Sequence, residues 1–418
     1  MAILLQNVQN ALQKVIMPYI QDNFPKQTIL MDQIKRNQGV TFMNDTFYAP
    51  IRTSRHGGIT NLANDGNTLV SGQASIGQAS IGVKIVTGTF DISKLTMDAT
   101  KTNKGAVENQ LTWQASTLAK DFARDINRQY FSDGVGVLAQ VATSGSVGVG
   151  TIALQYPDTN LDDGRSIDWY GTVNGDLSPT KYIAPGMILG IGTAAADLGT
   201  VTAVNGNTVI VTGAPAVVAN DTVYRVDGNG EGAGTAEIQG IRAALSSSTG
   251  TSTYANVARN TYGWTPQVQG AGTASALTLS DMEQVYLAAK EFAQTGDRYA
   301  IFMNKTLYKK YGDLLTAMRR SVNTTELLGG WTGLEFAAGA GKVGVFLDYD
   351  TPDGEVEIIN LDSWTVCQVS EMNWLEDPSG GALIRRRDAI TYQATMVWFT
   401  NLLCLCPAAN GRLLRKTA

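Results

Sequence analysis

Residues 104–131, KGAVENQLTWQASTLAKDFARDINRQYF, decide how the rest of this chain is interpreted. The apolar residues of this stretch recur at spacings of three and four, which places them on one stripe of an amphipathic helix. They are Val107, Leu111, Ala115, Leu118, Phe122 and Ile126. Asn103 is expected to cap the start of the helix, and Gly134 lies just past its end. At 1.5 Å per residue the helix would be roughly 40 Å long, so we expect a spine helix with one buried face.

The composition bounds the fold class and the compartment. A chain of 418 residues predicts two or three domains, and a hydrophobic content of 44% is enough for a sizeable core. The net charge of −5 provides no global basic field that would attract nucleic acid. Three cysteines are too few for a disulfide scaffold and favour a reducing compartment. No run of eighteen apolar residues is present and the first residues do not resemble a signal peptide, so we expect a cytosolic product without a membrane span.

Residues 1–37 are predicted to form an N-terminal arm. Its apolar residues follow helical spacing, and they are Leu4, Leu5, Val8, Leu12, Val15 and Ile16. Such a helix cannot bury its stripe alone, so it must pack on the body or on another subunit.

Residues 38–100 are predicted to form a long two-stranded extension. One strand is expected near 40–51, VTFMNDTFYAPI, and the other near 80–93, SIGVKIVTGTFDIS, which includes Lys84. The segment between them is polar and Gly-rich and contains a tandem QASIG pair. We expect it to be a flexible tip that carries Arg55 and His56. It has too little apolar surface for a core of its own, so it is expected to pack on a neighbouring subunit.

Residues 135–235 form a compositional block rich in Gly, Val, Thr and Ala. The stretch 200–213, TVTAVNGNTVIVTG, predicts a hairpin that turns at Asn205-Gly206. A further strand is expected at 223–226, and GNGEGAGT at 228–235 has the composition of an exit linker. The block is therefore predicted to be a small inserted β-barrel or sandwich.

Residues 236–418 have the pattern of a mixed α/β body. Ser280 and Glu283 predict a capping box for a helix near 281–294. The remaining elements expected here are a buried strand at 299–304, a helix near 305–320, strands at 342–348 and 355–361 around a turn at 352–354, and a long strand or strand pair at 391–406.

No motif along the chain keeps the context that catalysis requires. The string Gly190–Ala195 matches G-x-G-x-x-A, but a hairpin follows it where a dinucleotide site needs a helix. Gly339–Lys342 lacks two residues of a phosphate-binding loop, and His56 is the only histidine. Cys404 and Cys406 have no second Cys pair for zinc and are expected to be small buried hydrophobes. We therefore expect no enzyme, no cofactor and no metal site.

Charged residues offer candidates for contacts between subunits. Asp121–Arg124 and Asp125–Arg128 have the i,i+3 spacing of helix ion pairs, and a solvated face and an intersubunit face both remain open. The short basic runs at 385–387 and at Arg412, Arg415 and Lys416 are expected to pair between subunits instead of binding DNA. The candidate interface residues are Arg55, His56, Lys84, Asp121, Arg124 and Arg128.

The order of these parts resembles the major capsid protein of tailed bacteriophages, the Hong Kong 97-type or Johnson fold. The resemblance is carried by an N-terminal arm, a β arm entered at FYAPI, the spine helix and a C-terminal NLLCLCPAANGRL. It implies an α+β fold with an extension loop at 38–100, the spine helix of a peripheral domain at 101–134, an inserted all-β domain at 135–235, and an axial domain with the rest of the peripheral domain at 236–418.

The same resemblance implies a function. The chain would assemble into pentamers and hexamers that form an icosahedral head around double-stranded DNA, which it would contact non-specifically. It would be assembled in the host cytoplasm, belong to the virion and meet portal, scaffolding or decoration proteins. Two alternatives remain open from the sequence: a tail-tube or sheath subunit, and a carbohydrate-active enzyme with a β accessory domain. The sequence does not determine the size of the shell.

Overall fold

The computed structural model describes residues 30, 33–37, 39–61, 71–94, 104–143, 148–155, 179–192, 198–214, 217–225, 237–246, 252–270, 275–293, 298–317, 324–327, 331–338, 341–352, 354–376, 383–386 and 390–417. At some positions inside these ranges, including 104–113, only the backbone is described. The predictions for the N-terminal helix, the Asn103 cap and the linker at 228–235 concern residues outside the described ranges.

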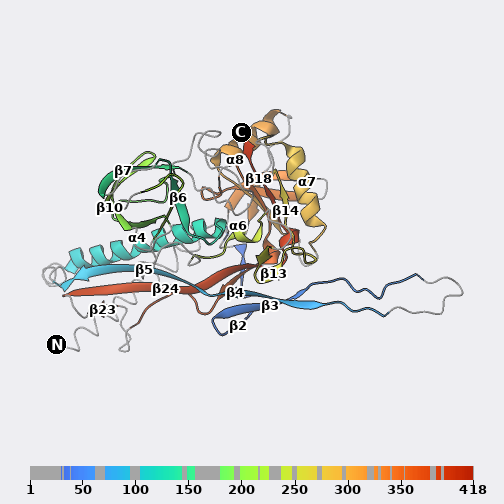
Figure 1. The fold of residues 1–418 in the computed structure, drawn as a ribbon, viewed down its shortest axis with the longest axis horizontal. Coiled ribbons are helices and arrows are strands. Elements are labelled where there is room, and N and C mark those ends of the chain that lie inside the picture. Colours follow the sequence, from blue (N-terminus) through green and yellow to red (C-terminus); the bar gives the residue numbers. More distant parts are fainter. Residues whose placement is uncertain are drawn as a thin grey trace.

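The spine helix is confirmed as α4, Lys104–Phe131, a single helix of 28 residues. Phe122 and Ile126 of the predicted stripe are buried, and Leu118 packs against the same core. The helix lies along strand β5, Lys84–Ser93, as Figure 1 shows. A Cβ atom placed on Gly88 of β5 would lie 3.1 Å from Leu118 and 3.2 Å from Phe122. The bare backbone at Gly88 therefore lets the helix approach the strand closely.

The spine helix shares its core with a six-stranded sheet built around β24, Thr391–Cys404. Of the two forms predicted for 391–406, a strand pair or one long strand, the structure shows one strand of 14 residues. β5, β21, β22 and β23 all pair antiparallel with it, while β1 pairs parallel with β21. These strands are β1 Lys35–Arg36, β21 Trp364–Gln368, β22 Asn373–Trp374 and β23 Ile384–Arg385.

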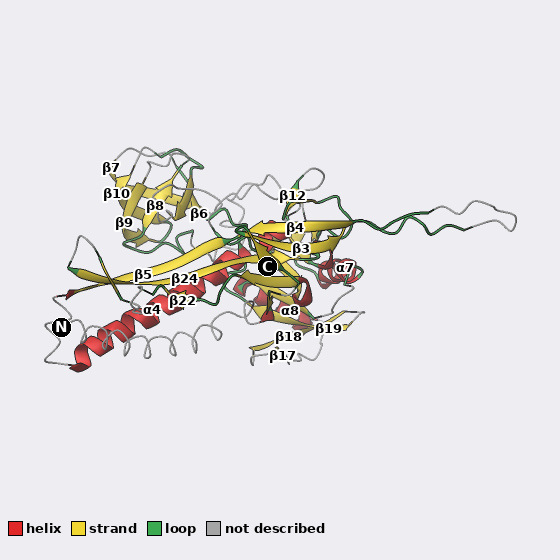
Figure 2. Ribbon diagram, turned by 90° about the horizontal axis from the view of Figure 1, so that it is seen from below, coloured by secondary structure: helices red, strands yellow, loops and turns green. Residues whose placement is uncertain are grey.

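A three-stranded sheet forms the base of a long arm that extends beyond the body in both views (Figures 1 and 2). Its strands are β2 Thr41–Met43, β3 Thr46–Arg52 and β4 Ile76–Gly82. Phe47 and Ala79 are buried in the core of the body, so the base of the arm is anchored.

The block between the spine helix and the α/β body contains a closed six-stranded barrel. Its order is β10-β7-β6-β11-β8-β9, and its interior is a separate core of Val, Ile and Leu side chains. The strands are β6 Val137–Val141, β7 Gly148–Gln155, β8 Ile188–Ile191, β9 Leu198–Asn205, β10 Thr208–Ala214 and β11 Thr222–Arg225. The hairpin expected at 200–213 is confirmed, but Thr208 pairs with Asn205, so the loop is Gly206-Asn207, one residue later than predicted. Gly206 takes φ +58°, a conformation that glycine adopts without strain.

The remaining body is a seven-stranded mixed sheet with two helices on one face. In spatial order its strands are β14 Gln267–Gln269, β25 Gly411–Leu413, β20 Val356–Asn360, β16 Tyr299–Met303, β19 Gly341–Leu347, β18 Trp331–Ala338 and β17 Thr324–Leu327. The helices are α7 Leu279–Lys290 and α8 Lys305–Ala317. The smaller elements are α6 Ile241–Ala244, the 3-10 turns Leu361–Ser363 and Pro407–Ala409, and the short pairs β12 Thr253–Tyr254 with β13 Val257–Ala258 and β15 Ser275–Ala276 with β26 Lys416–Thr417.

The capping box predicted for α7 is wrong in its position. The cap is Thr278, whose side chain accepts a hydrogen bond from the Asp281 N–H at 3.1 Å. The helix begins two residues earlier than expected because Leu279 packs against the core beneath it. The buried face predicted for this helix is confirmed, since Met282, Val285 and Tyr286 all lie in that core.

Candidate assembly surfaces and the joint of the barrel

The arm exposes apolar side chains on its base and beyond it. Ile59 and Ile76 have 82% and 80% of their surface exposed, and Met43 at the edge of the base has 60% exposed. Arg55 and His56 are also exposed on this part of the chain, where His56 Nδ1 accepts a hydrogen bond from the Gly58 N–H at 3.1 Å. Because the arm extends beyond the body, these side chains are candidates for contact with another chain.

The prediction that Lys84 belongs to the arm is wrong. The chain switches sheets at Val83, whose N–H donates to the carbonyl of Asp45 at 3.0 Å. Lys84 begins β5 in the six-stranded sheet, where it pairs with Thr400, and partial burial lowers its pKa. The alternation of side chains is similar on both sides of Val83, so the pattern does not reveal that the strand changes partners.

The charged residues of the spine helix divide into two groups. Asp121 and Arg124 are exposed, and within the described part of the chain no ion pair joins them. Arg128 is instead buried, with 6% of its surface exposed, and pairs inside its own subunit. The intersubunit role expected for Arg128 is therefore wrong, because its place at the end of the helix turns it toward the barrel.

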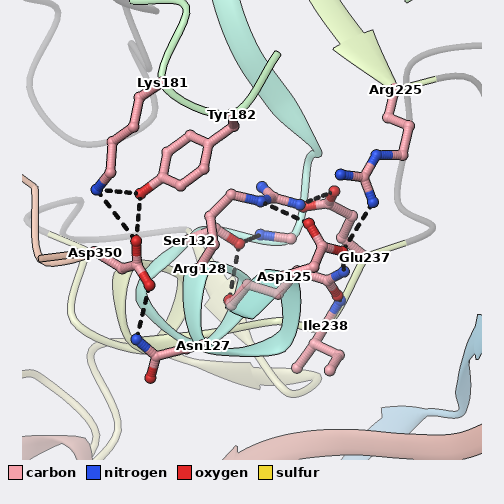
Figure 3. Close-up of polar contacts among 12 residues, drawn as sticks. Asp125, Asn127, Arg128, Ser132, Lys181, Tyr182, Arg225, Glu237, Ile238 and Asp350 are labelled. Atoms are coloured by element: carbon pink, nitrogen blue, oxygen red, sulfur yellow. Dashed lines mark hydrogen bonds and ion pairs between the residues drawn. The ribbon is translucent and has the colours of Figure 1, made fainter. Parts of the chain in front are cut away.

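Arg128 is the centre of a polar joint where the barrel meets the spine helix (Figure 3). Its guanidinium donates to Asp125 at 3.2 Å and to Glu237, which follows the barrel in the chain. Arg225, at the end of β11, donates to the other oxygen of Asp125 at 2.9 Å. Burial works to raise the pKa of Asp125, but the charges of Arg128 and Arg225 outweigh it and hold that pKa below its usual value.

The second half of the joint connects the barrel to the loop after β19. The Lys181 ammonium lies 3.2 Å from Asp350, and the Tyr182 hydroxyl donates to the same carboxylate at 2.9 Å. On the opposite side, Asn127 of the spine helix donates to Asp350 at 2.8 Å and to Asp348 at 3.1 Å. Figure 3 shows Lys181 and Tyr182 reaching Asp350 from one side and Asn127 from the other. Three parts of the fold therefore meet on one pair of carboxylates.

The two carboxylates differ in their environment. Asp348 is buried, and burial followed by the charge of Asp350 raises its pKa to about 6. Burial and Asp350 likewise raise the pKa of Tyr182 well above its usual value, so its hydroxyl stays protonated and remains a donor.

The basic run at 412–416 is internal, so the intersubunit pairing predicted for it is wrong for Arg412 and Lys416. Arg412 is fully buried between Glu355, at 2.7 Å, and Glu357, at 3.2 Å. Lys416 is buried as well and pairs with Asp281 of α7 at 2.8 Å. Both residues lie in short strands of the body, β25 and β26, which the sequence pattern is too brief to predict.

The described residues of the glycine-rich strings and of the cysteine pair singled out in the sequence lie in strands or close to their ends. Gly190 lies in strand β8, where a Cβ atom would sit 2.2 Å from the ring of Tyr224, so this glycine makes room for an aromatic residue. Gly341 lies in a hairpin, paired with Ala338. Burial raises the pKa of the Cys404 thiol.

Within the described ranges no group of three His, Cys, Asp or Glu side chains is placed to hold a metal ion. No helix in those ranges is long and apolar enough to cross a bilayer.

Sequence reasoning missed most of the joint. Lys181, Tyr182, Glu237, Asp348 and Asp350 come from three separate segments. The one usable signal was Asp348-Tyr349-Asp350 directly after a buried strand, since two carboxylates so close to a core usually have partners.

Comparison with known proteins identifies the fold. No protein-family model matches the chain, and no curated protein sequence matches it. Among solved structures, the chain is similar to the capsid of cyanophage A-1(L), with 13% identity, a TM-score of 0.51, and 93% of this chain and 92% of that chain covered. It is also similar to the capsid of a native GTA particle, with 10% identity, a TM-score of 0.44 and 93% and 90% coverage. The Myoviridae phage XM1 capsid matches with 12% identity, a TM-score of 0.40 and 93% and 91% coverage. The fold is thus the Hong Kong 97-type capsid fold, as the sequence predicted.

Proposed function

We propose that this chain is a major capsid protein that assembles with copies of itself into pentamers and hexamers of a closed icosahedral head. The observation that carries the proposal is the arm, which is anchored at Phe47 and Ala79 but exposes Ile76 at the outer end of its base and Ile59 beyond it. A single subunit leaves this apolar surface in water, whereas a ring of subunits covers it. Each copy would gain burial at about 25 cal/mol per Å² of apolar area.

The same proposal assigns the parts of the chain. Residues 1–37 would be the N-terminal arm and 38–82 the extension loop. Residues 101–134 would be the spine helix of the peripheral domain, and 135–235 the inserted domain. The axial domain and the remainder of the peripheral domain would lie in 236–418. This extension loop is shorter than the predicted 38–100, because β5, Lys84–Ser93, pairs with β24 in the six-stranded sheet. Of the candidate contacts, Arg55, His56, Asp121 and Arg124 remain on exposed positions.

The location and partners follow from this role. The protein would belong to the virion, assemble in the host cytoplasm and enclose double-stranded DNA, which it would contact without sequence preference. Portal, scaffolding or decoration proteins are the further partners that such a shell would meet. The proposed role includes no catalytic step.

A deletion in the arm tests the proposal. Gly58 and Gly72 face each other across the arm, since a Cβ atom on Gly72 would lie 2.2 Å from the Gly58 nitrogen. Removing residues 59–71 and joining the chain there should leave the base and the body intact. We expect a folded subunit with an unchanged circular-dichroism spectrum and no closed particles in negative-stain images, while the full chain forms them.

Two outcomes would contradict the proposal. Closed particles from the deleted chain would remove the arm from assembly. A full chain that stays a monomer or dimer in solution, under conditions where it is folded and concentrated, would favour a different class of protein.

A further inference from the structure

The barrel has its own core, so its orientation on the body depends on the joint. The barrel side of one contact is Lys181 and Tyr182, in the turn that precedes β8, and the body side is Asp350. Lys181 also donates to the carbonyl of Tyr349. These bonds and the Arg225–Asp125 pair connect two units with separate interiors. Asp350, with Asp348 beside it, therefore takes part in holding the barrel to the body.

Two like charges meet at this contact. Asp348 accepts from the Asp350 N–H at 2.9 Å, and the two carboxylates share the amide of Asn127 as a donor. Of the cations, Lys181 contacts Asp350 directly. Arg128 lies over the ring of Tyr182 at 5.7 Å, but its charge is already paired with Glu237 and Asp125. Arg225 is paired with Asp125. The pair thus carries two negative charges when ionised and, among the described residues, faces one directly bound cation.

We propose that the contact between the barrel and the seven-stranded sheet is a proton-operated latch, in which Asp348 takes up a proton in mild acid and the latch closes more tightly. The proton removes the repulsion between Asp348 and Asp350 and gives Asp348 an O–H group that can donate to the neighbouring carboxylate. Lys181 then compensates the single charge left on Asp350. The inference does not depend on the assembly function, since it concerns contacts within one subunit.

The direction of the effect follows from linkage. Asp348 has a pKa raised to about 6 when the latch is closed, and it would return toward its ordinary value of 3.8 when the latch opens into water. The closed form therefore binds the proton more strongly, and its stability grows as pH falls through about 6 and is lost as pH rises. Between pH 7.5 and pH 5.0 this difference corresponds to a roughly tenfold decrease in latch opening.

Amide hydrogen exchange on the folded full chain tests the proposal. After correction for the intrinsic pH dependence of exchange, we expect the protection of residues 179–192 and 348–352 to rise roughly tenfold from pH 7.5 to pH 5.0. D348N places a neutral side chain of the same shape there, and should give high protection that no longer changes with pH. K181M removes the directly bound cation, and should move the midpoint of the change toward higher pH.

Asp91 provides the matched control. It is an exposed carboxylate that pairs with Arg386 at 3.0 Å, away from the joint. D91N should leave the pH dependence of the latch as it is in the wild type. The proposal is overturned if wild-type protection is equal at both pH values, or if D348N keeps the wild-type dependence. If D348N were poorly folded, an unmoved midpoint in K181M would overturn the proposal by itself.

Discussion

Phe131, in the last turn of the spine helix, packs edge-on against Phe302 in the central strand of the seven-stranded sheet, with ring centroids 5.9 Å apart and planes at 68°. Both rings are buried. The face of the sheet opposite α7 and α8 is thereby joined to the core of the spine helix. This aromatic pair ties the two largest parts of the body together.

Removing one ring of this pair should be costly. Phe131→Ala should lower the free energy of unfolding by about 3–5 kcal/mol, because it deletes a fully packed aromatic side chain. Urea denaturation followed by circular dichroism measures the change. Leu287→Ala, at a position on α7 that is 44% exposed, is the control and should cost less than about 1 kcal/mol. Equal costs would mean that the pair does not hold the two parts together.

Two glycines of the barrel should respond differently to alanine. Gly190→Ala places a methyl group against the buried ring of Tyr224 and should destabilise the chain by about 1–3 kcal/mol through overpacking. Gly150→Ala, in β7, meets no atom within 4 Å and should be nearly neutral. Thermal melting of both variants compares them, and a neutral Gly190→Ala would show that the ring of Tyr224 can move aside.

The buried charge cluster around Arg412 predicts a large effect from a single truncation. Arg412→Met leaves Glu355 and Glu357 without the guanidinium that lies between them, and should cost about 3–5 kcal/mol. Arg386→Met removes an exposed partner of Asp91 and should cost no more than about 1 kcal/mol. Denaturant titrations of the two variants check the contrast. A small loss in Arg412→Met would indicate that Arg242, 3.0 Å from Glu355, compensates alone.

Charge reversal should affect subunit stability at Arg128 but not at Arg124, the other arginine of the spine helix. Arg128→Glu places a third carboxylate beside Asp125 and Glu237 and should destabilise the subunit by at least ~3 kcal/mol. Arg124→Glu lies on the exposed face, so the subunit should remain folded. If Arg124 contacts a neighbour, its reversal should reduce the particle yield most at low salt, where screening is weakest. Light scattering across a salt series measures the yield, and equal yields for Arg124→Glu and wild type at every salt concentration would rule out that contact.

The exposed isoleucines predict where a polar substitution blocks assembly. Ile76→Asp, on the arm, should leave circular dichroism and melting unchanged but reduce particle yield at least tenfold. Ile188→Asp, on the barrel at 51% exposure, is the matched control and should assemble normally. Assembly of Ile76→Asp at the wild-type level would mean that this part of the arm stays in water.

The sequence predicted elements whose signal is local and periodic. The stripe of α4, the hairpin at 205–208, the buried strand at 299–303 and the face of α7 all depend on the chain's own repeat. The joint could not be predicted, because its contacts, Arg225 with Asp125 and Lys181 with Asp350, form only after segments far apart in the sequence have folded together. Arg412 and Lys416 were misplaced for a related reason, since a basic side chain near a tail suggests solvent until its buried carboxylate partners are known.

The pairing of β5 with β24 has a consequence for the order of folding. Arg386 and Asp91, which join across this sheet, are separated by 295 residues in the sequence. During synthesis at about 5–20 residues per second, β5 would wait tens of seconds for its partner strand. The apolar stripe of α4 would stay uncovered for that time, because the same sheet closes its core. Such long-range pairing is slow to form and exposes the chain to aggregation, so the yield of soluble subunit should depend on how fast the ribosome reaches β24 and on whether a chaperone protects the helix until then.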